Sequence, residues 1–190
     1  MTGWKDKSKI MQRYDLTSEM YDERYSEEQK AKYDAALVKV NVTGSRVLDV
    51  GCGSGLFFKE IASLADMVVG VDISRKLLFK SQNHVKVFRN VFVVQADADH
   101  LPLVKGFFDA VFAFTVLQNM PKPSETLNEL KIVVKPEGKV IVTALKKAFA
   151  LPTFMDLLEA AGFKVVGFVD DEALKCYVSE LEINMFASET

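Results

Sequence analysis

The residues of this chain that could do chemistry stand just after hydrophobic runs. The segment 49–55 reads Asp-Val-Gly-Cys-Gly-Ser-Gly, with glycines at three alternate positions. Glycines at a turn from strand to helix permit positive φ angles and let a ligand approach the backbone closely. The amide groups at the start of the following helix would then face an anion or a carboxylate. This pattern predicts a site for a nucleoside-bearing ligand at the carboxyl edge of a parallel sheet.

Two further carboxylates follow later hydrophobic runs in the same way. Asp72 closes the run 67–71, and Asp97 comes two residues after the run 91–95. A carboxylate at the tip of a strand can accept both hydroxyl hydrogens of a ribose, which is the role we expect for Asp72. Asp72 could instead only cap a helix or a turn. Asp97 is the second carboxylate that we expect to contact the ligand, although Asp99, two residues later, could take its place.

Alternating strands and helices are needed to bring these residues to one edge. The hydrophobic pattern predicts parallel strands over 46–50, 67–71, 91–95, 108–117 and 139–145. Helices are expected over 27–39, over 55–64, over 75–82 with Ser74 as cap, from Pro123 onward, and over 151–161. The runs 163–169 and 176–186 have only a loop between them and should pair antiparallel. The sequence therefore predicts an α/β fold with a doubly wound seven-stranded sheet, five strands parallel and the last two a C-terminal antiparallel hairpin.

Length and composition are typical of one globular domain over 1–190, with a helical lid segment over 1–40 and the α/β core over 45–190. Hydrophobic residues make up 49% and charged residues 26%, and the net charge of −2 does not favour nucleic acid overall.

Cys52 and Cys176 are too few and too distant for a disulfide framework or a zinc site, so no metal is expected. Because the first ten residues lack the apolar part of a signal peptide and no run approaches the roughly 18 apolar residues of a membrane span, we expect a cytoplasmic protein without a membrane contact.

Several motifs, in order, resemble those of the class I S-adenosylmethionine-dependent methyltransferases, most of all the small enzymes that include ubiquinone-biosynthesis and tRNA-wobble methyltransferases. The segment 49–55 resembles their glycine-rich first motif, Asp72 their acidic residue after the second strand, and 97–102 (Asp-Ala-Asp-His-Leu-Pro) their motif D-A-x-x-L-P. The stretches 108–111 and 134–139 resemble the fourth strand and the turn before the fifth. The resemblance covers about residues 14–142 and implies a Rossmann-like fold, methyltransferase activity and S-adenosylmethionine as the cofactor.

The resemblance also implies roles for single residues. Asp72 would hold the ribose hydroxyls and Asp97 the adenine amino group. Asp49 would face the amino-acid end of the cofactor, with Gly51 and Gly53 leaving room for its methionine portion. The expected cofactor-binding set is completed by Cys52 (a small filler of the loop and not a nucleophile), Ile73, Ala98, Thr115 and Tyr21.

Two other functions compete with this interpretation. A nicotinamide- or flavin-dependent oxidoreductase would need the fingerprint G-x-G-x-x-G, but the position after Gly55 is Leu56. The missing glycine and the terminal hairpin both argue against it. The second alternative is a cofactor-binding or scaffold subunit that has lost catalysis.

Methyl transfer from a sulfonium asks the protein mainly to position the nucleophile. Gln118 and Asn119, just after the fourth strand, are the candidate catalytic residues, at a place where the resembled enzymes often carry two histidines. Because an amide cannot act as a general base, this favours a neutral amine or an ionised thiol over a phenol or a carbon acid. The alternative is that both amides only cap the strand and the next helix. Tyr14 and Tyr21 lie two helical turns apart and can face the cofactor from a lid.

The sequence does not identify the acceptor, which could be a small molecule, an RNA or a protein. The basic residues around the third helix could meet phosphate, although they could equally form a solvated helix face: Arg75, Lys76, Lys80, Lys86 and Arg89. The resemblance to tRNA-wobble enzymes also implies a small activator subunit, because some enzymes of that kind use one.

Overall fold

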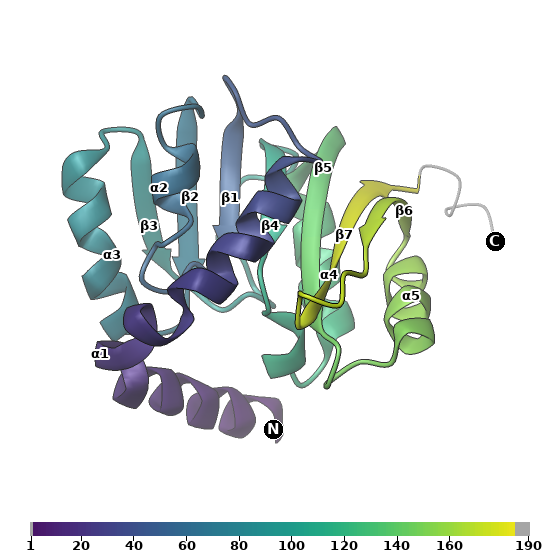
Figure 1. Ribbon diagram of the computed structural model, residues 1–190, viewed down its shortest axis with the longest axis horizontal. Helices are drawn as coiled ribbons and strands as arrows, with labels where there is room; N and C mark the ends of the chain where they lie inside the picture. The colour runs from purple at the N-terminus through teal and green to yellow at the C-terminus, as the bar shows by residue number, and fades with distance from the viewer. Residues whose placement is uncertain (1, 185–190) are drawn as a thin grey trace.

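Seven strands form one mixed sheet in the computed structural model, which describes residues 2–184 and the side chains of 7–12, 14–16 and 27–184 (Figure 1). Their order across the sheet is β3-β2-β1-β4-β5-β7-β6, and only β7 runs antiparallel to its neighbours. The predicted architecture is therefore confirmed. The strands are β1 (Arg46–Val50), β2 (Met67–Asp72), β3 (Val91–Gln95), β4 (Phe108–Ala113), β5 (Val134–Leu145), β6 (Phe163–Val169) and β7 (Cys176–Ile183).

Four strands differ from the predicted bounds, although β2 only extends by one residue, to Asp72. β4 ends at Ala113 and not at 117, because Thr115 adopts a positive φ of 55° that turns the chain out of the sheet. β5 begins at Val134 and not at 139, because Val134 already pairs with Phe108, and the predicted turn at 136–138 is a register shift within this pairing. β7 ends at Ile183, before the predicted end at 186, and the predicted residues 185 and 186 lie outside the described part of the chain.

The helices are α1 (Thr2–Leu37), α2 (Phe58–Ile61), α3 (Arg75–Val87), α4 (Pro123–Val133) and α5 (Leu151–Ala160), with a 3-10 turn η1 (Leu117–Asn119). Ser74 caps α3 as predicted, because its hydroxyl accepts a hydrogen bond from the Leu77 N–H at 3.2 Å.

The helix predicted over 55–64 is wrong, since α2 has a single turn. Gly55 has a φ of 83°, which no right-handed helix contains, and so helix cannot begin there. Past α2 the N–H groups of Leu64 and Ala65 both bond to the carbonyl of Ile61, which mixes the 3-10 and α spacings. Any ligand at this turn would therefore meet the amides of the glycine loop and not the end of a long helix.

The sheet has an apolar core on each face. Leu48, Val111 and Val140 lie in the core that α4 and α5 cover, through residues such as Leu130 and Phe154. The core on the other face includes Val47, Phe112 and Ile141, covered by α2, α3 and the C-terminal part of α1. With both faces buried, the parallel strands leave their carboxyl edge as the place for a ligand.

Helix α1 serves two purposes along its length. Figure 1 shows its first half passing along the carboxyl edge of the sheet and its second half lying across one sheet face. The second half is fixed by Tyr33 and Ala36, which are buried in the core. The predicted helix over 27–39 is therefore only the end of a much longer one. No helix among residues 2–184 combines the length and the apolar character that crossing a membrane requires.

Candidate active site

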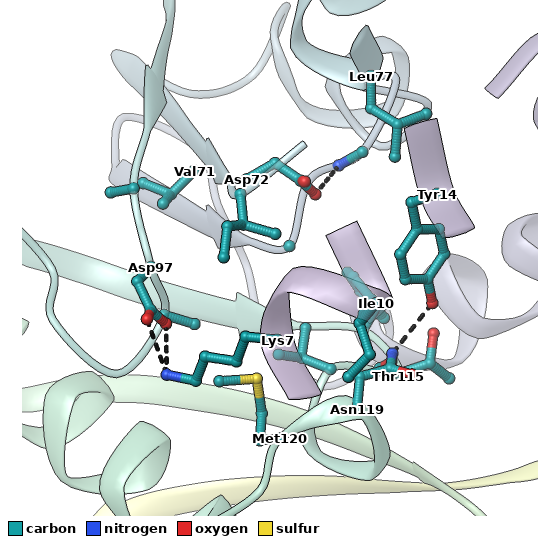
Figure 2. Close-up of a pocket in the computed structure, with 17 residues that line it drawn as sticks. Lys7, Ile10, Tyr14, Val71, Asp72, Leu77, Asp97, Thr115, Asn119 and Met120 are labelled. Carbon is teal, nitrogen blue, oxygen red and sulfur yellow. Dashed lines mark hydrogen bonds and ion pairs between the residues drawn. The ribbon is translucent and has the colours of Figure 1, made fainter. Parts of the chain in front are cut away.

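A cavity lies at the carboxyl edge, where the segments after β1, β2, β3 and β4 meet the first half of α1 (Figure 2). Its empty volume is about 720 Å³ when the open mouth is counted. Sequence-predicted residues from all four segments come together in its lining: Gly51, Gly53, Asp72, Ile73, Asp97, Ala98, Thr115 and Asn119.

The glycine loop after β1 is held by the neighbouring strand. The N–H groups of Gly51 and Cys52 bond to the carbonyl of Val71 at 2.7 and 3.0 Å. Gly51 has a φ of 74°, and a Cβ there would lie 2.6 Å from Val116 Cγ2. The glycine at 51 is therefore required by its positive φ, as the sequence predicted, and also by the closeness of Val116, which the sequence did not reveal. Burial raises the pKa of the Cys52 thiol, which agrees with a filler and not a nucleophile.

Asp72 joins this loop to the start of α3. Its carboxylate accepts the Gly53 N–H at 2.9 Å and the Ser74 N–H at 2.7 Å. Burial raises its pKa, although these hydrogen bonds act in the opposite direction. Each carboxylate oxygen keeps a second lone pair, and the side chain lines the cavity. The geometry can therefore accept hydroxyl groups of a ligand while it holds the loop.

Asp97 lines the cavity, whereas Asp99 does not. Asp99 is only 4% exposed, accepts a hydrogen bond from the Thr126 hydroxyl and pairs with Lys7. The cavity thus favours Asp97 as the ligand-facing carboxylate of the two. The Lys7 ammonium lies 2.8 Å from each oxygen of Asp97. Burial alone would lower the pKa of Lys7, but its hydrogen bonds to Asp97 and Asp99 raise the pKa overall and keep the group cationic.

A second, smaller cavity shares Gly51 and Phe114 with the first and contains Asp49. Asp49 Oδ2 and Gln29 Oε1 are both buried there, and neither has a hydrogen-bond partner. Burial, and secondarily the charge of Asp72, raise the pKa of Asp49 to about 8. Two orphaned acceptors next to the glycine loop fit a cationic, hydrogen-donating group such as the ammonium of an amino acid. Cys52 also faces this second cavity and not the first.

The turn after β4 forms the far wall of the main cavity. The Thr115 N–H donates to the Thr143 hydroxyl at 2.8 Å, and its carbonyl accepts from the side-chain amides of Gln118 and Asn119. Asn119 Nδ2 also lies 3.0 Å from the Tyr14 hydroxyl oxygen, to which it donates (Figure 2). Asn119 therefore faces the cavity, whereas Gln118 is absent from its lining and supports the turn.

Sequence reasoning missed Lys7 and Ile10, which line the cavity together with the predicted Tyr14. The three stand at positions i, i+3 and i+7, which is the spacing of one helix face. This spacing could have identified Lys7 and Ile10 if the sequence had predicted a helix over this segment. The side chain of Tyr21 lies outside the described residues. Within those residues, no cluster of three histidine, cysteine or carboxylate side chains is placed to hold a metal ion.

Known proteins resemble this chain in sequence and in fold. A family model described as a methyltransferase domain matches residues 48–142, half of the chain. The ubiquinone biosynthesis O-methyltransferase of Dechloromonas aromatica is 34% identical over 113 residues, which are 57% of this chain and 47% of that protein. The chain thus spans about half the length of the curated relatives it matches.

Solved structures share the fold. A methyltransferase from Aquifex aeolicus that depends on S-adenosylmethionine superposes with a TM-score of 0.72 at 20% identity, over 83% of this chain and 97% of that one. The [4+2]-cyclase SpnF superposes with a TM-score of 0.78 at 23% identity, over 87% and 75% of the two chains. Because a cyclase shares the fold, the family is shown by the sequence match and not by shape alone. The chain belongs to the class I S-adenosylmethionine-dependent methyltransferases.

Proposed function

We propose that this methyltransferase acts on an acceptor whose lone pair is already free, a neutral amine or an ionised thiol. The observation that carries the proposal is the lack of a base: among the described residues that line the main cavity there is no histidine, and the only carboxylates are Asp72 and Asp97. Both stand at strand tips where they serve the cofactor. Lys7 is cationic, and Asn119 is an amide, so neither can remove a proton at neutral pH.

The residues present fit the cofactor. When bound, S-adenosylmethionine supplies an electrophilic methyl group on a sulfonium. Asp72 would accept the ribose hydroxyls and Asp97 the adenine amine, while Asp49 and Gln29 would accept from the cationic amino-acid end. The first half of α1 would exclude water from the cavity.

At the acceptor end, Asn119 and Tyr14 would orient the nucleophile. Both side chains line the cavity, and the hydrogen bond that Asn119 Nδ2 donates to the Tyr14 hydroxyl fixes how these two polar groups lie toward the acceptor. We expect Tyr14→Phe and Asn119→Ala to lower kcat/KM for the acceptor about tenfold to a hundredfold, with the affinity for S-adenosylmethionine unchanged.

Transfer to a phenol oxygen is the second candidate, favoured by the O-methyltransferase relatives. Methyl-labelled S-adenosylmethionine, offered with panels of amines, thiols and catechols, separates the two. Our proposal expects labelled N- or S-methyl products. Labelled methyl ethers alone would overturn it and support the second candidate.

A further inference from the structure

Lys7 places its ammonium group directly in front of the Asp97 carboxylate. Nζ lies 2.8 Å from both Oδ1 and Oδ2, an equidistant position that faces the carboxylate end-on (Figure 2). Asp97 Oδ1 additionally accepts the Asp99 N–H at 3.1 Å. The side of the carboxylate that faces the cavity is therefore already occupied by a cation from α1.

The adenine amine needs the same carboxylate. Under the proposed function, Asp97 is the acceptor for that amine, and this inference rests on that assignment. An amine approaching in the plane of the carboxylate meets the place that Nζ holds, because both donors seek the same lone pairs. Lys7 and adenine cannot both take the front of Asp97 at hydrogen-bond distance.

We propose that Lys7 is a latch that competes with the adenine amine for Asp97, and that cofactor binding moves Lys7 onto Asp99 alone. Asp99 can receive the cation, because it already pairs with Lys7 and its carboxylate is nearly buried. The Thr126 hydroxyl donates to Asp99 and holds it in place. The exchange therefore keeps the Lys7 cation paired, since an unpaired buried charge would be costly, and leaves Asp97 with the adenine amine and the Asp99 N–H as its hydrogen-bond donors.

The latch also reaches the acceptor end of the cavity. Ile10 and Tyr14 follow Lys7 on the same face of α1 and line the same cavity, and Tyr14 contacts Asn119. Asp15, one residue further, accepts a hydrogen bond from the Ser74 hydroxyl at the start of α3. A shift of α1 at Lys7 would displace the Tyr14 hydroxyl, so adenine recognition would set the shape of the acceptor site.

A ligand pair isolates the competition. S-adenosylhomocysteine carries the adenine amine, whereas S-inosylhomocysteine carries a carbonyl oxygen at that position. Lys7→Met should lower the Kd of the adenosyl ligand, because the ammonium group that competes with its amine is gone. The same change should raise the Kd of the inosyl ligand, because its carbonyl oxygen loses a cation from which it can accept a hydrogen bond. The ratio of the inosyl to the adenosyl Kd, measured by calorimetry, should therefore rise about tenfold or more above the wild-type ratio.

Lys9→Met is the matched control, because Lys9 is exposed on the same helix and does not line the cavity. Its ratio should equal that of the wild type. Lys7→Gln gives a second neutral variant should Lys7→Met fold poorly. An equal change in the Kd of both ligands, with their ratio unchanged, would mean that Lys7 only stabilises the position of α1. That result would overturn the latch. If neither ligand binds the wild type, the proposed function falls and the latch with it.

A second readout reports on α1 itself. Trp4 is the only tryptophan of the chain and lies three residues before Lys7 on α1. Its emission in the wild type should change on saturation with the adenosyl ligand and change much less with the inosyl ligand. The same emission change with both ligands would contradict displacement of Lys7 by the amine.

Discussion

Thr115 adopts a backbone conformation that residues other than glycine rarely take. It is the only residue other than glycine with a positive φ among residues 2–184, and its side chain is β-branched, which makes this conformation costly. Three hydrogen bonds hold Thr115 in this conformation. Its N–H donates to the Thr143 hydroxyl, and its carbonyl accepts from the side-chain amides of Gln118 and Asn119. A strained residue at the wall of the cavity is consistent with a backbone shaped for a ligand.

Replacing Thr115 by a residue that tolerates this conformation should stabilise the protein. Asparagine adopts the left-handed region more readily than threonine, so Thr115→Asn should raise the free energy of unfolding by about 0.5–1 kcal/mol. Urea denaturation measures the change. Thr143→Val should act in the opposite direction, by about 1–3 kcal/mol, because the Thr115 N–H loses its acceptor. A destabilised Thr115→Asn would show that the site does not store strain there.

Asp49 should make stability depend on pH. Burial raises its pKa to about 8, so between about pH 4 and 8 the folded protein holds a proton that the unfolded chain has released. Raising the pH through this window therefore favours unfolding. Asp49→Asn removes this effect and should be more stable than the wild type at pH 8 by at least about 1 kcal/mol, with the difference shrinking toward pH 4. A difference independent of pH would contradict the buried, protonated Asp49.

At the scale of elements, the sequence predicted strands better than it predicted turns and helix ends. β1, β3 and β6 have their predicted bounds because short apolar runs end at polar or glycine residues. The end of β4 could not be predicted, because the apolar run 108–117 continues through a turn whose cause is the φ of Thr115. The single turn of α2 also escaped prediction, because Phe57 and Ile61 have helical spacing even though Gly55 prevents a helix.

Some residues of the candidate site could likewise be predicted from the sequence and others could not. Its strand-tip residues, Asp72 and Asp97, were predictable because parallel strands bring their carboxyl ends to one edge. The role of Lys7 could not be predicted, because it depends on where a helix distant in sequence crosses that edge. The spacing of hydrophobic residues does not determine where a helix crosses a sheet edge. Asn119 and Gln118 are neighbours in sequence, yet only the structure separates the one that lines the cavity from the one that supports the turn.

The second half of α1 is anchored by a buried cation. The Lys32 side chain is 2% exposed and pairs with Glu28 at 2.9 Å, while the other Glu28 oxygen pairs with the exposed Lys175 at 2.7 Å. Glu28→Gln should lower the free energy of unfolding by about 1–3 kcal/mol, because Lys32 loses its counter-charge in a buried place. Lys175→Gln is the control and should change it by less than about 0.5 kcal/mol. Equal effects in urea denaturation would contradict the anchor.

At the scale of the whole molecule, both faces of the sheet are covered, and the carboxyl edge carries the site. Residues from four strand ends and from α1 converge there, although they are up to about a hundred positions apart in the chain. The expected activator subunit and a nucleic-acid acceptor stay predictions, as does a cytoplasmic location. The methyl donor site is the part of the account on which the proposed chemistry and the latch both depend.

The most direct test is a calorimetric titration of the wild type, Asp72→Asn and Asp109→Asn with S-adenosylmethionine. Asp72→Asn keeps the side-chain shape but loses the charge of the ribose contact, so its Kd should rise about tenfold or more. Asp109 is also a paired carboxylate, bonded to Lys135 and to the Arg46 N–H, but it stands at the start of β4, away from the cavity. Asp109→Asn should therefore bind like the wild type. Equal affinities for all three proteins, or no binding to the wild type, would contradict the cofactor site at this edge.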